Sequence, residues 1–316
     1  MSNIRLQPRR LVLVGSVLVD VLMYIERLPE RGGDTLARQT SFTTGAGFNV
    51  LSGARRLGLA AAYAGHVGTG PMGKQISADL EAAGIPLLLP RVQGEDSGFD
   101  VALVERDAER TFITSPGVES RLRLEDLQAI PLQSGDIVYL SGYELCYPVS
   151  GASLEQWIPA LREDILLALD PGPLVADIPA GRLARVLARV DILSLNTREA
   201  RLLAGEKSQP QLVAELAPRL APGARVIVRA GAEGCWIGSP GTPARHIPPR
   251  PTRAIDSTGA GDTHMAALLA RLAAGDDFGT AARLANIAAS LSTERPGPAT
   301  SPTLQEVQTA YQHGQG

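Results

Sequence analysis

The sequence alternates short apolar runs with longer segments in which apolar residues recur at helical spacing. Runs of strand length cover, in chain order, residues 11–19, 61–67, 136–140, 165–169, 191–195 and 226–229. Helical spacing predicts helices at about 50–57, 75–83, 152–162, 179–188, 265–272, 278–291 and 304–311, with another after 199. Such an alternation predicts an α/β fold with a mostly parallel central sheet flanked by helices.

Two segments interrupt this alternation. Residues 21–44 are typical of short strands and turns, and residues 97–115 of a hairpin whose second strand begins at Arg110. Together they predict a small β-sheet beside the main one, in the position of a lid. Arg110 is expected to face solvent, with a ligand contact as the alternative. Because the chain has no internal repeat, low-complexity linker or charge run, residues 1–316 are predicted to form a single domain with this lid.

Composition mainly excludes classes of function. Of the 316 residues, 44% are hydrophobic and 20% charged, as in an ordinary globular protein, and the net charge of −3 gives no reason to expect nucleic-acid or membrane binding. Cys146 and Cys235 match no metal-binding spacing, so free thiols in a reducing cytoplasm are expected. The apolar run at 11–14 is too short for a signal peptide or a membrane span, and a buried strand is predicted there.

The stretch Asp-Ser-Thr-Gly-Ala-Gly-Asp-Thr at 256–263 carries the clearest chemistry. It places a small-residue turn before the helix predicted at 265–272, where unpaired N–H groups and the helix dipole favour an anion. Gly259 and Gly261 allow close approach to the backbone. A carboxylate repels a neighbouring anion, so its presence there is explained best if it accepts a proton or binds a metal. Asp262 is therefore predicted to accept a hydroxyl proton in a kinase reaction, the alternative being a tight loop with a capping Asp.

Polar residues also follow several predicted strands. In chain order they are Asp20, Glu144, Asp170, Asn196, Glu199 and Arg229. Parallel strands bring their carboxyl ends to one edge of a sheet, where α/β proteins bind ligands. These side chains are therefore expected to converge on a site.

Three of the candidate sites also have structural explanations. Gly45-Ala46-Gly47-Phe48-Asn49 opens a predicted helix, so Asn49 either contacts a hydroxylated ligand or belongs to a simple helix entry. Asn196 and Glu199, three residues apart, either order water around Mg²⁺ or cap their helix. Asn286 either contacts a bound base or is a satisfied amide of the core.

The segment Gly68–Gly73, followed by Lys74, fits the spacing of both a dinucleotide fingerprint and a phosphate-binding loop. Gln75 stands where a phosphate-binding loop needs Ser or Thr for Mg²⁺, and the segment does not belong to the first strand–helix unit. A structural turn is predicted. A dinucleotide-dependent oxidoreductase that uses this loop is the rival function from another class of enzyme.

Along nearly its whole length the chain resembles the ribokinase-like (PfkB) carbohydrate kinases. The resemblance rests on residues 45–49, on Asn196-x-x-Glu199 and on residues 256–262, three motifs in the family's order. Among these kinases it is most similar to bacterial sugar kinases of unassigned substrate, which like this chain have His after the Gly-Asp-Ser/Thr; the His is His264 here. The resemblance implies a three-layer α/β/α fold with a mostly parallel central sheet and a small β lid.

The resemblance also implies a role for each matching residue. Asp262 would be the catalytic base, and the anion hole would consist of the backbone amides of Gly259, Ala260 and Gly261. The sugar would be held by Asp20, Gly45, Gly47, Asn49 and, as a weaker candidate, Glu144. The Mg-ATP site would include Asn196, Glu199, Arg229, Gly231, Gly234 and Asn286, with Glu199 serving Mg²⁺ through water. A monovalent cation such as K⁺ would bind near Asp256 and Thr258.

The implied function is ATP-dependent phosphorylation of a hydroxyl, expected to be primary, on a small carbohydrate. The partners would be the sugar and ATP, and in many members of the family the lid builds a dimer. The alternatives are a nucleoside kinase of the same fold and a sugar- or nucleotide-binding protein without turnover. His264 and Ala266 replace a usual Phe and a common Gly, and Thr69-Gly70-Pro71 replaces a common acidic pair, which leaves the substrate open. His264 is expected to be packed within its helix, with a contact to the sugar site as the alternative.

Overall fold

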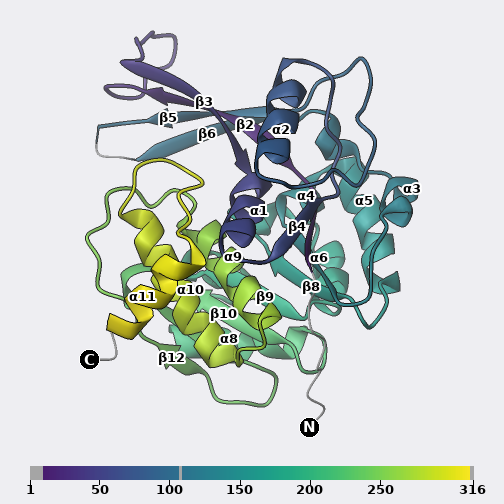
Figure 1. Cartoon of the computed structure of the whole chain (residues 1–316), viewed down its shortest axis with the longest axis vertical. Helices are drawn as coiled ribbons and strands as arrows, with labels where there is room; N and C mark the ends of the chain where they lie inside the picture. The colour runs from purple at the N-terminus through teal and green to yellow at the C-terminus, as the bar shows by residue number, and fades with distance from the viewer. Residues whose placement is uncertain (1–9, 107–108, 314–316) are drawn as a thin grey trace.

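An eight-stranded sheet forms the centre of the molecule. The computed structural model describes residues 10–106 and 109–313. Across the sheet the strand order is β12-β11-β10-β9-β8-β7-β1-β4 (Figure 1). The strands are β1 (Arg10–Val14), β4 (Ala60–Tyr63), β7 (Asp136–Ser141), β8 (Leu166–Asp170), β9 (Ile192–Asn196), β10 (Arg225–Arg229), β11 (Cys235–Gly238) and β12 (Arg245–Ile247). All pairs from β4 to β10 are parallel, and β11 and β12 continue the sheet as an antiparallel hairpin.

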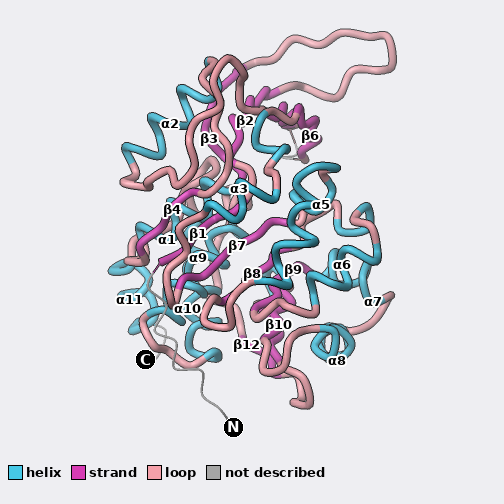
Figure 2. The backbone as a smooth tube through the Cα atoms, turned by 90° about the vertical axis from the view of Figure 1, so that its right-hand side faces the viewer, coloured by secondary structure: helices cyan, strands magenta, loops and turns pink. Residues whose placement is uncertain are grey.

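Helices cover both faces of this sheet, so the predicted three-layer architecture is confirmed (Figure 2). One layer contains α1 (Gly47–Arg56), α2 (Pro71–Ala82), α9 (Ala260–Ala273), α10 (Phe278–Thr293) and α11 (Leu304–His313). The other contains α3 (Leu124–Ala129), α4 (Tyr143–Cys146), α5 (Pro148–Trp157), α6 (Ala180–Leu187), α7 (Thr197–Ala204) and α8 (Gln209–Leu216). Alternate side chains of a strand point to opposite faces, so Leu11 and Leu13 of β1 pack into the first core and Val12 and Val14 into the second. Within the described ranges, no helix is long and apolar enough to span a membrane.

A second sheet of four strands, in the order β3-β2-β5-β6, lies at one end of the molecule (top of Figure 1). Its strands are β2 (Val17–Tyr24), β3 (Gln39–Ala46), β5 (Phe99–Val104) and β6 (Arg110–Ser115). The two segments that break the α/β alternation thus come together as the predicted lid. Residues 107–108, which belong to the hairpin predicted at 97–115, lie outside the described residues.

The apolar run at 11–19 is not one strand as predicted. It divides into β1, in the central sheet, and β2, in the lid. Gly15 has a φ of 140°, which is strained for residues with a β-carbon, and the chain changes sheet there. The Tyr63 hydroxyl holds this junction, since it donates to the Gly15 carbonyl at 2.7 Å and accepts from the Val17 N–H at 3.1 Å. Asp20 therefore lies inside a lid strand and not at the end of a central strand.

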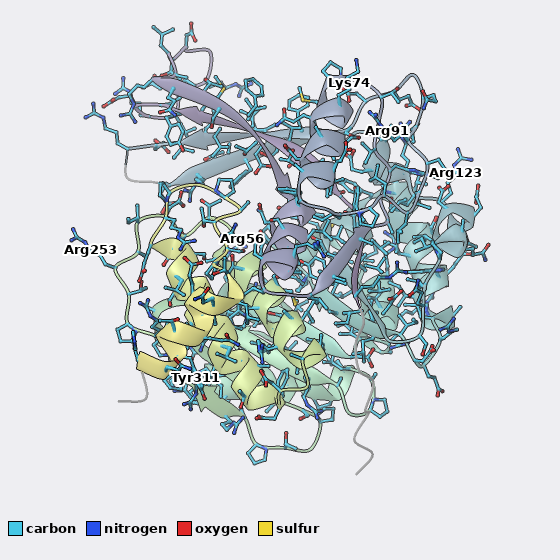
Figure 3. The ribbon with its side chains drawn as sticks, in the orientation of Figure 1. Arg56, Lys74, Arg91, Arg123, Arg253 and Tyr311 are labelled. Carbon is cyan, nitrogen blue, oxygen red and sulfur yellow. The ribbon has the colours of Figure 1, made fainter. Side chains whose placement is uncertain are left out.

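The loop at 68–73 is a structural turn, as predicted. Asp96 accepts hydrogen bonds from the N–H groups of Met72 at 3.1 Å and Gly73 at 2.8 Å. These donors would be needed to hold a phosphate, but a carboxylate of the protein already binds them. The Lys74 side chain is exposed at the outer surface of the molecule (Figure 3). The geometry gives no support to a dinucleotide-dependent enzyme that uses this loop.

Candidate active site

Helix α9 begins at the small-residue turn of the 256–263 motif. Gly259, its N-cap, has a φ of 70°, in the left-handed region that favours glycine. The Ala260 N–H donates to the Ser257 carbonyl at 3.2 Å, and the Thr263 N–H to the Gly259 carbonyl at 2.8 Å. The N–H groups of Gly261 and Asp262 fall in the first turn, which has no intrahelical acceptors for them. The turn therefore offers backbone donors at the positive end of the helix dipole.

Asp256 fixes the shape of this turn. Its Oδ1 accepts hydrogen bonds from the Thr258 N–H at 2.9 Å and the Thr258 hydroxyl at 2.6 Å, and its Oδ2 accepts from the Gly297 N–H at 2.9 Å. The Arg110 Nη2 also donates to Oδ1, at 2.6 Å. Burial opposes ionisation, but these hydrogen bonds outweigh it and lower the pKa of Asp256 to about 2. The expectation that Arg110 faces solvent is wrong, because its guanidinium joins the lid to the α9 turn.

A cavity of about 390 Å³ lies between the lid and the central sheet, and we call it the acceptor cavity. Its polar walls come from distant parts of the chain and include Asp20, Asn49, Asp100, Glu144 and Asp262. The Asn49 Nδ2 donates to the Asp262 Oδ2 at 3.0 Å. The structure thus brings together four of the predicted residues, Asp20, Asn49, Glu144 and Asp262, and Gly47 also lines the cavity.

Gly45 does not line the cavity, but it makes room for a residue that does. A β-carbon at Gly45 would lie 2.0 Å from the Asp20 Oδ2. A larger residue would therefore displace the Asp20 carboxyl group from its position. The structure thus supports a steric role for Gly45, which leaves room for the Asp20 carboxyl group.

Burial makes the carboxyl groups of this cavity weak acids. It raises the pKa of Asp262 to about 6, although the hydrogen bond from Asn49 opposes this shift. It raises the pKa of Glu144 to about 8. The pKa of Asp20 also rises to about 8, because of burial first and then the neighbouring Asp100 carboxyl group. At neutral pH, Asp262 is thus mostly ionised, whereas Glu144 is mostly protonated.

Asp100 is an acidic residue of the cavity that the strand-end pattern does not predict, because it lies inside lid strand β5. Its Cα is the register partner of Asp20 on the neighbouring parallel strand β2. Both side chains line the cavity. A signal was present in the sequence, since the carboxylate stands on the same face of its strand as Ala102 and Val104, which are buried.

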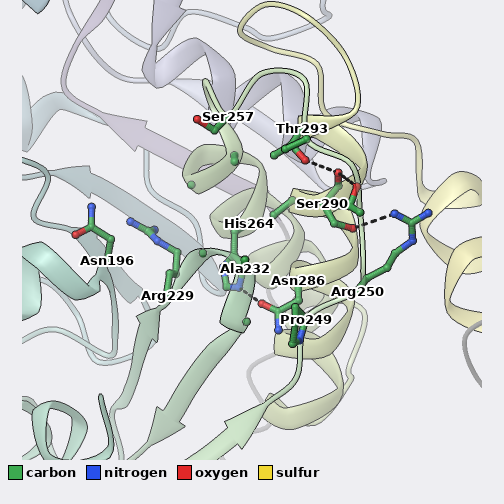
Figure 4. Close-up of a pocket in the computed structure, with 17 residues that line it drawn as sticks. Asn196, Arg229, Ala232, Pro249, Arg250, Ser257, His264, Asn286, Ser290 and Thr293 are labelled. Atoms are coloured by element: carbon green, nitrogen blue, oxygen red, sulfur yellow. Dashed lines mark hydrogen bonds between the residues drawn. The ribbon is translucent and has the colours of Figure 1, made fainter. Parts of the chain in front are cut away.

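A second cavity, of about 430 Å³, lies on the other side of the α9 turn, and we call it the nucleotide cavity (Figure 4). The predicted nucleotide residues that line it are Asn196, Arg229, Gly231, Gly234 and Asn286. The Arg229 Nη1 donates to the Asp170 Oδ2 at 2.8 Å, and its Nη2 lies 3.7 Å from the Glu199 Oε2. These ion pairs hold the guanidinium beside the start of α9, where Gly261 also lines the cavity.

Asn286 has both of its polar atoms in hydrogen bonds. Its Nδ2 donates to the carbonyls of Ile247 at 3.1 Å and Pro248 at 3.0 Å, and its Oδ1 lies 3.2 Å from the His264 Nε2 (Figure 4). The structure therefore shows the satisfied amide that was one of the two alternatives, placed on the cavity wall. His264 is buried within α9, as expected, and burial lowers its pKa to about 3.

Asn196 and Glu199 form the predicted capping pair. The Glu199 N–H donates to the Asn196 Oδ1 at 2.9 Å, and the Asn196 N–H donates to the Glu199 Oε2 at 2.8 Å. Both Glu199 oxygens accept hydrogen bonds from Asn196, and the side chain is buried. Each oxygen has a second lone pair, which is the capacity that an outer-sphere contact to Mg²⁺ through water would use. Over residues 10–106 and 109–313, no group of three His, Cys, Asp or Glu side chains is placed to hold a metal directly.

The Asp256 carboxylate, which was expected near a bound monovalent cation, is paired with a cationic side chain of the lid. The carboxylate already accepts four hydrogen bonds, one of them from the Arg110 guanidinium. The Thr258 hydroxyl, the other predicted ligand, donates its proton to the same carboxylate. The positive charge beside Asp256 is thus supplied by the lid.

Comparisons with known proteins agree with this geometry. The model of the pfkB family of carbohydrate kinases matches residues 8–304. The uncharacterized sugar kinase YegV of Escherichia coli is 33% identical over 305 residues, which cover 96% of this chain and 94% of YegV. The ATP-dependent ribose-1-phosphate kinase of Halopiger xanaduensis is 27% identical over 300 residues, 94% of this chain and 96% of that protein. The ribokinase of Arabidopsis thaliana, solved with ribose and ATP, superposes with a TM-score of 0.79 at 25% identity and covers 96% of this chain and 98% of its own.

Proposed function

The chain belongs to the pfkB family of carbohydrate kinases, and we propose that it transfers the γ-phosphate of ATP to a hydroxyl of a small carbohydrate. A primary hydroxyl is the expected acceptor. Asp262 would be the catalytic base, and the backbone amides of Gly259, Ala260 and Gly261 would form the anion hole. The relative from Arabidopsis binds ribose and ATP, and this supports the same two classes of ligand here.

The observation that carries the proposal is the position of the α9 turn between the two cavities. Thr258, Gly259 and Asp262 line the acceptor cavity, whereas Ala260 and Gly261 line the nucleotide cavity. A hydroxyl in one cavity and a terminal phosphate in the other would therefore meet at the N-terminus of the helix. This is the arrangement that in-line phosphoryl transfer requires.

In this mechanism the protein supplies position and charge. The Asp262 carboxylate orients the acceptor hydroxyl and takes its proton as the bond to phosphorus forms, and Asn49 fixes the carboxylate through its 3.0 Å hydrogen bond. The backbone amides of the turn stabilise the charge on the transferring group, and Arg229 holds positive charge beside them. Asn196 and Glu199 would contact the water shell of nucleotide-bound Mg²⁺, which neutralises phosphate charge when it is bound.

The test is ADP release from Mg-ATP across pentoses, hexoses, sugar acids and nucleosides, with Asp262→Asn in parallel. We expect turnover with one class of acceptor and a kcat lower by ~10²-fold or more in Asp262→Asn, with ATP binding retained. A near-normal kcat in that variant would remove Asp262 from its role. Turnover with nucleosides alone would favour the nucleoside kinase, and ATP binding without any turnover would favour a binding protein.

We also propose that the lid pairs with the lid of a second copy of the chain. Val21, Phe42, Val101 and Ile113 occupy one row across the four lid strands. The neighbouring row, with Asp20 and Asp100, faces the acceptor cavity, so this apolar row lies on the opposite face. Phe42 and Ile113 are 57% and 62% exposed. Apolar side chains in a row on a sheet favour burial against another apolar surface.

A further inference from the structure

The polar walls of the acceptor cavity contain several buried atoms without a hydrogen-bond partner in the described part of the chain. Buried oxygens that lack a hydrogen-bond partner among the described residues include the Asp20 Oδ1, the Asn49 Oδ1, the Asp100 Oδ1 and both carboxyl oxygens of Glu144. Glu144 is fully buried and Asp20 is 9% exposed, and both line the cavity. Buried polar atoms are rarely left unpaired. Hydroxyl groups of a bound molecule, which both donate and accept hydrogen bonds, would satisfy ionised and protonated carboxyl groups alike.

The cavity also lacks positive charge. Four carboxyl groups line it, those of Asp20, Asp100, Glu144 and Asp262, and no Arg, Lys or His is among its described lining residues. The nearby Arg110 is held by Asp256. A phosphate or carboxylate group on the acceptor would therefore enter beside acidic groups without a cation to pair with it.

Within this cavity, Asp20 and Asp100 form a pair. They are register partners on adjacent strands, and their carboxyl groups lie within hydrogen-bonding contact. Burial raises the pKa of both, to about 8 for Asp20 and about 6 for Asp100, so the two groups hold one proton between them near neutral pH. A pair in this state can accept hydrogen bonds from neighbouring hydroxyls through its outer oxygens.

We propose that Asp100, together with Asp20, determines acceptor specificity: the pair binds neighbouring hydroxyls of an uncharged polyhydroxylated sugar, and the cavity rejects phosphorylated and carboxylated sugars. This inference rests on the proposed kinase function and names the substrate class of the same site. It sets this chain apart from its Halopiger relative, whose name gives ribose-1-phosphate as the substrate. Like charges brought together in a binding site cost several kcal/mol, so we expect kcat/KM for an anionic sugar to be lower by ~100-fold or more than for its uncharged parent.

The experiment compares matched acceptors. ADP release is measured with uncharged aldoses, ketoses and alditols and with the aldonic acid and sugar phosphate derived from each. The variants are Asp100→Asn and the control Glu26→Gln, which removes a carboxylate of the lid that is exposed and paired with Arg106, outside the cavity. We expect Asp100→Asn to raise the KM for the uncharged sugar by ~10-fold with little change in kcat or in the KM for ATP, because one acceptor of the pair is lost.

The ratio of kcat/KM for the uncharged sugar to kcat/KM for its acid, called the selectivity ratio, provides a second readout that a purely structural role would not change. Removal of one acidic group should narrow the preference for the uncharged sugar over its acid in Asp100→Asn, whereas Glu26→Gln should keep the wild-type ratio. Wild-type turnover that is fastest with phosphorylated, carboxylated or amino sugars would overturn the inference and leave the kinase function standing. An unchanged ratio in Asp100→Asn would also overturn it. ATP binding without turnover of any acceptor would instead contradict the proposed function.

Discussion

The hydrogen bond between Asn49 and Asp262 should set the pH at which the enzyme loses activity. Burial raises the pKa of Asp262 to about 6, and the Asn49 bond is the main opposing influence. Since the base acts in its ionised form, kcat/KM for the acceptor should fall as the pH drops through about 6 in the wild type. Loss of the Asn49 amide should move this acidic limb to higher pH, because the ionised Asp262 carboxylate would lose the donor that stabilises it and its pKa would rise.

The size of the shift follows from the geometry. The bond spans 3.0 Å and ends on a carboxylate, and hydrogen bonds to charged groups contribute about 1.5–3 kcal/mol. At about 1.4 kcal/mol per pKa unit, its loss in Asn49→Ala would raise the pKa of Asp262 by about 1–2 units, to between about 7 and 8. At pH 7 the ionised fraction would fall from about nine-tenths to between about a half and a tenth.

The assay is kcat/KM for the acceptor from about pH 5 to about pH 9 at saturating Mg-ATP. The KM should also rise at every pH, because Asn49 lines the acceptor cavity. Ser52→Ala is a matched control on the same helix, since the Ser52 hydroxyl donates to the Asn49 carbonyl at 3.3 Å and to no other group among the described residues, and its profile should match the wild type. If the acidic limb of Asn49→Ala coincided with that of the wild type, the assignment of Asp262 as the titrating base held by Asn49 would be refuted.

Three further predictions concern the lid and the residues that it contacts. Arg110→Gln should lower the free energy of unfolding by about 1–2 kcal/mol and kcat/KM by ~10-fold, because Asp256 would lose its ion pair and the α9 turn would lose its link to the lid. Urea unfolding measures the first quantity and ADP release the second. Wild-type values of both quantities would contradict this link. In the same assay, replacing Na⁺ by K⁺ should leave wild-type kcat unchanged, since Arg110 already pairs with Asp256. Ile113→Glu should convert a dimer to a monomer in sedimentation while Glu26→Gln does not, and a monomeric wild type at micromolar concentration would exclude pairing through the lid.

Much of the fold could be predicted because alternating strand and helix patterns are local. The helix predicted at 152–162 lies instead at 148–157, since Pro148 starts it at a position where a proline is favoured. The division of the apolar run 11–19 could not be predicted from hydrophobicity, because both β1 and β2 are apolar. It depends on Gly15 and on a hydrogen bond from Tyr63, which is distant in the sequence.

The part of the site at the α9 turn was predicted, because one local motif carries its chemistry. The part formed by the lid was missed where its residues come together only after two strands pair. The predicted hairpin contained Asp100, but only the parallel register of β2 and β5 places it beside Asp20. The same holds for Arg110 and Asp256, which are 146 residues apart. In both strands a carboxylate stands on the face that is otherwise buried, which costs stability unless the group has a function. An acidic residue at a strand position that the pattern marks as buried is a local conflict, and such conflicts are expected at binding sites. Asp20 and Asp100 are therefore the residues of the lid strands from which contact with the acceptor could be inferred.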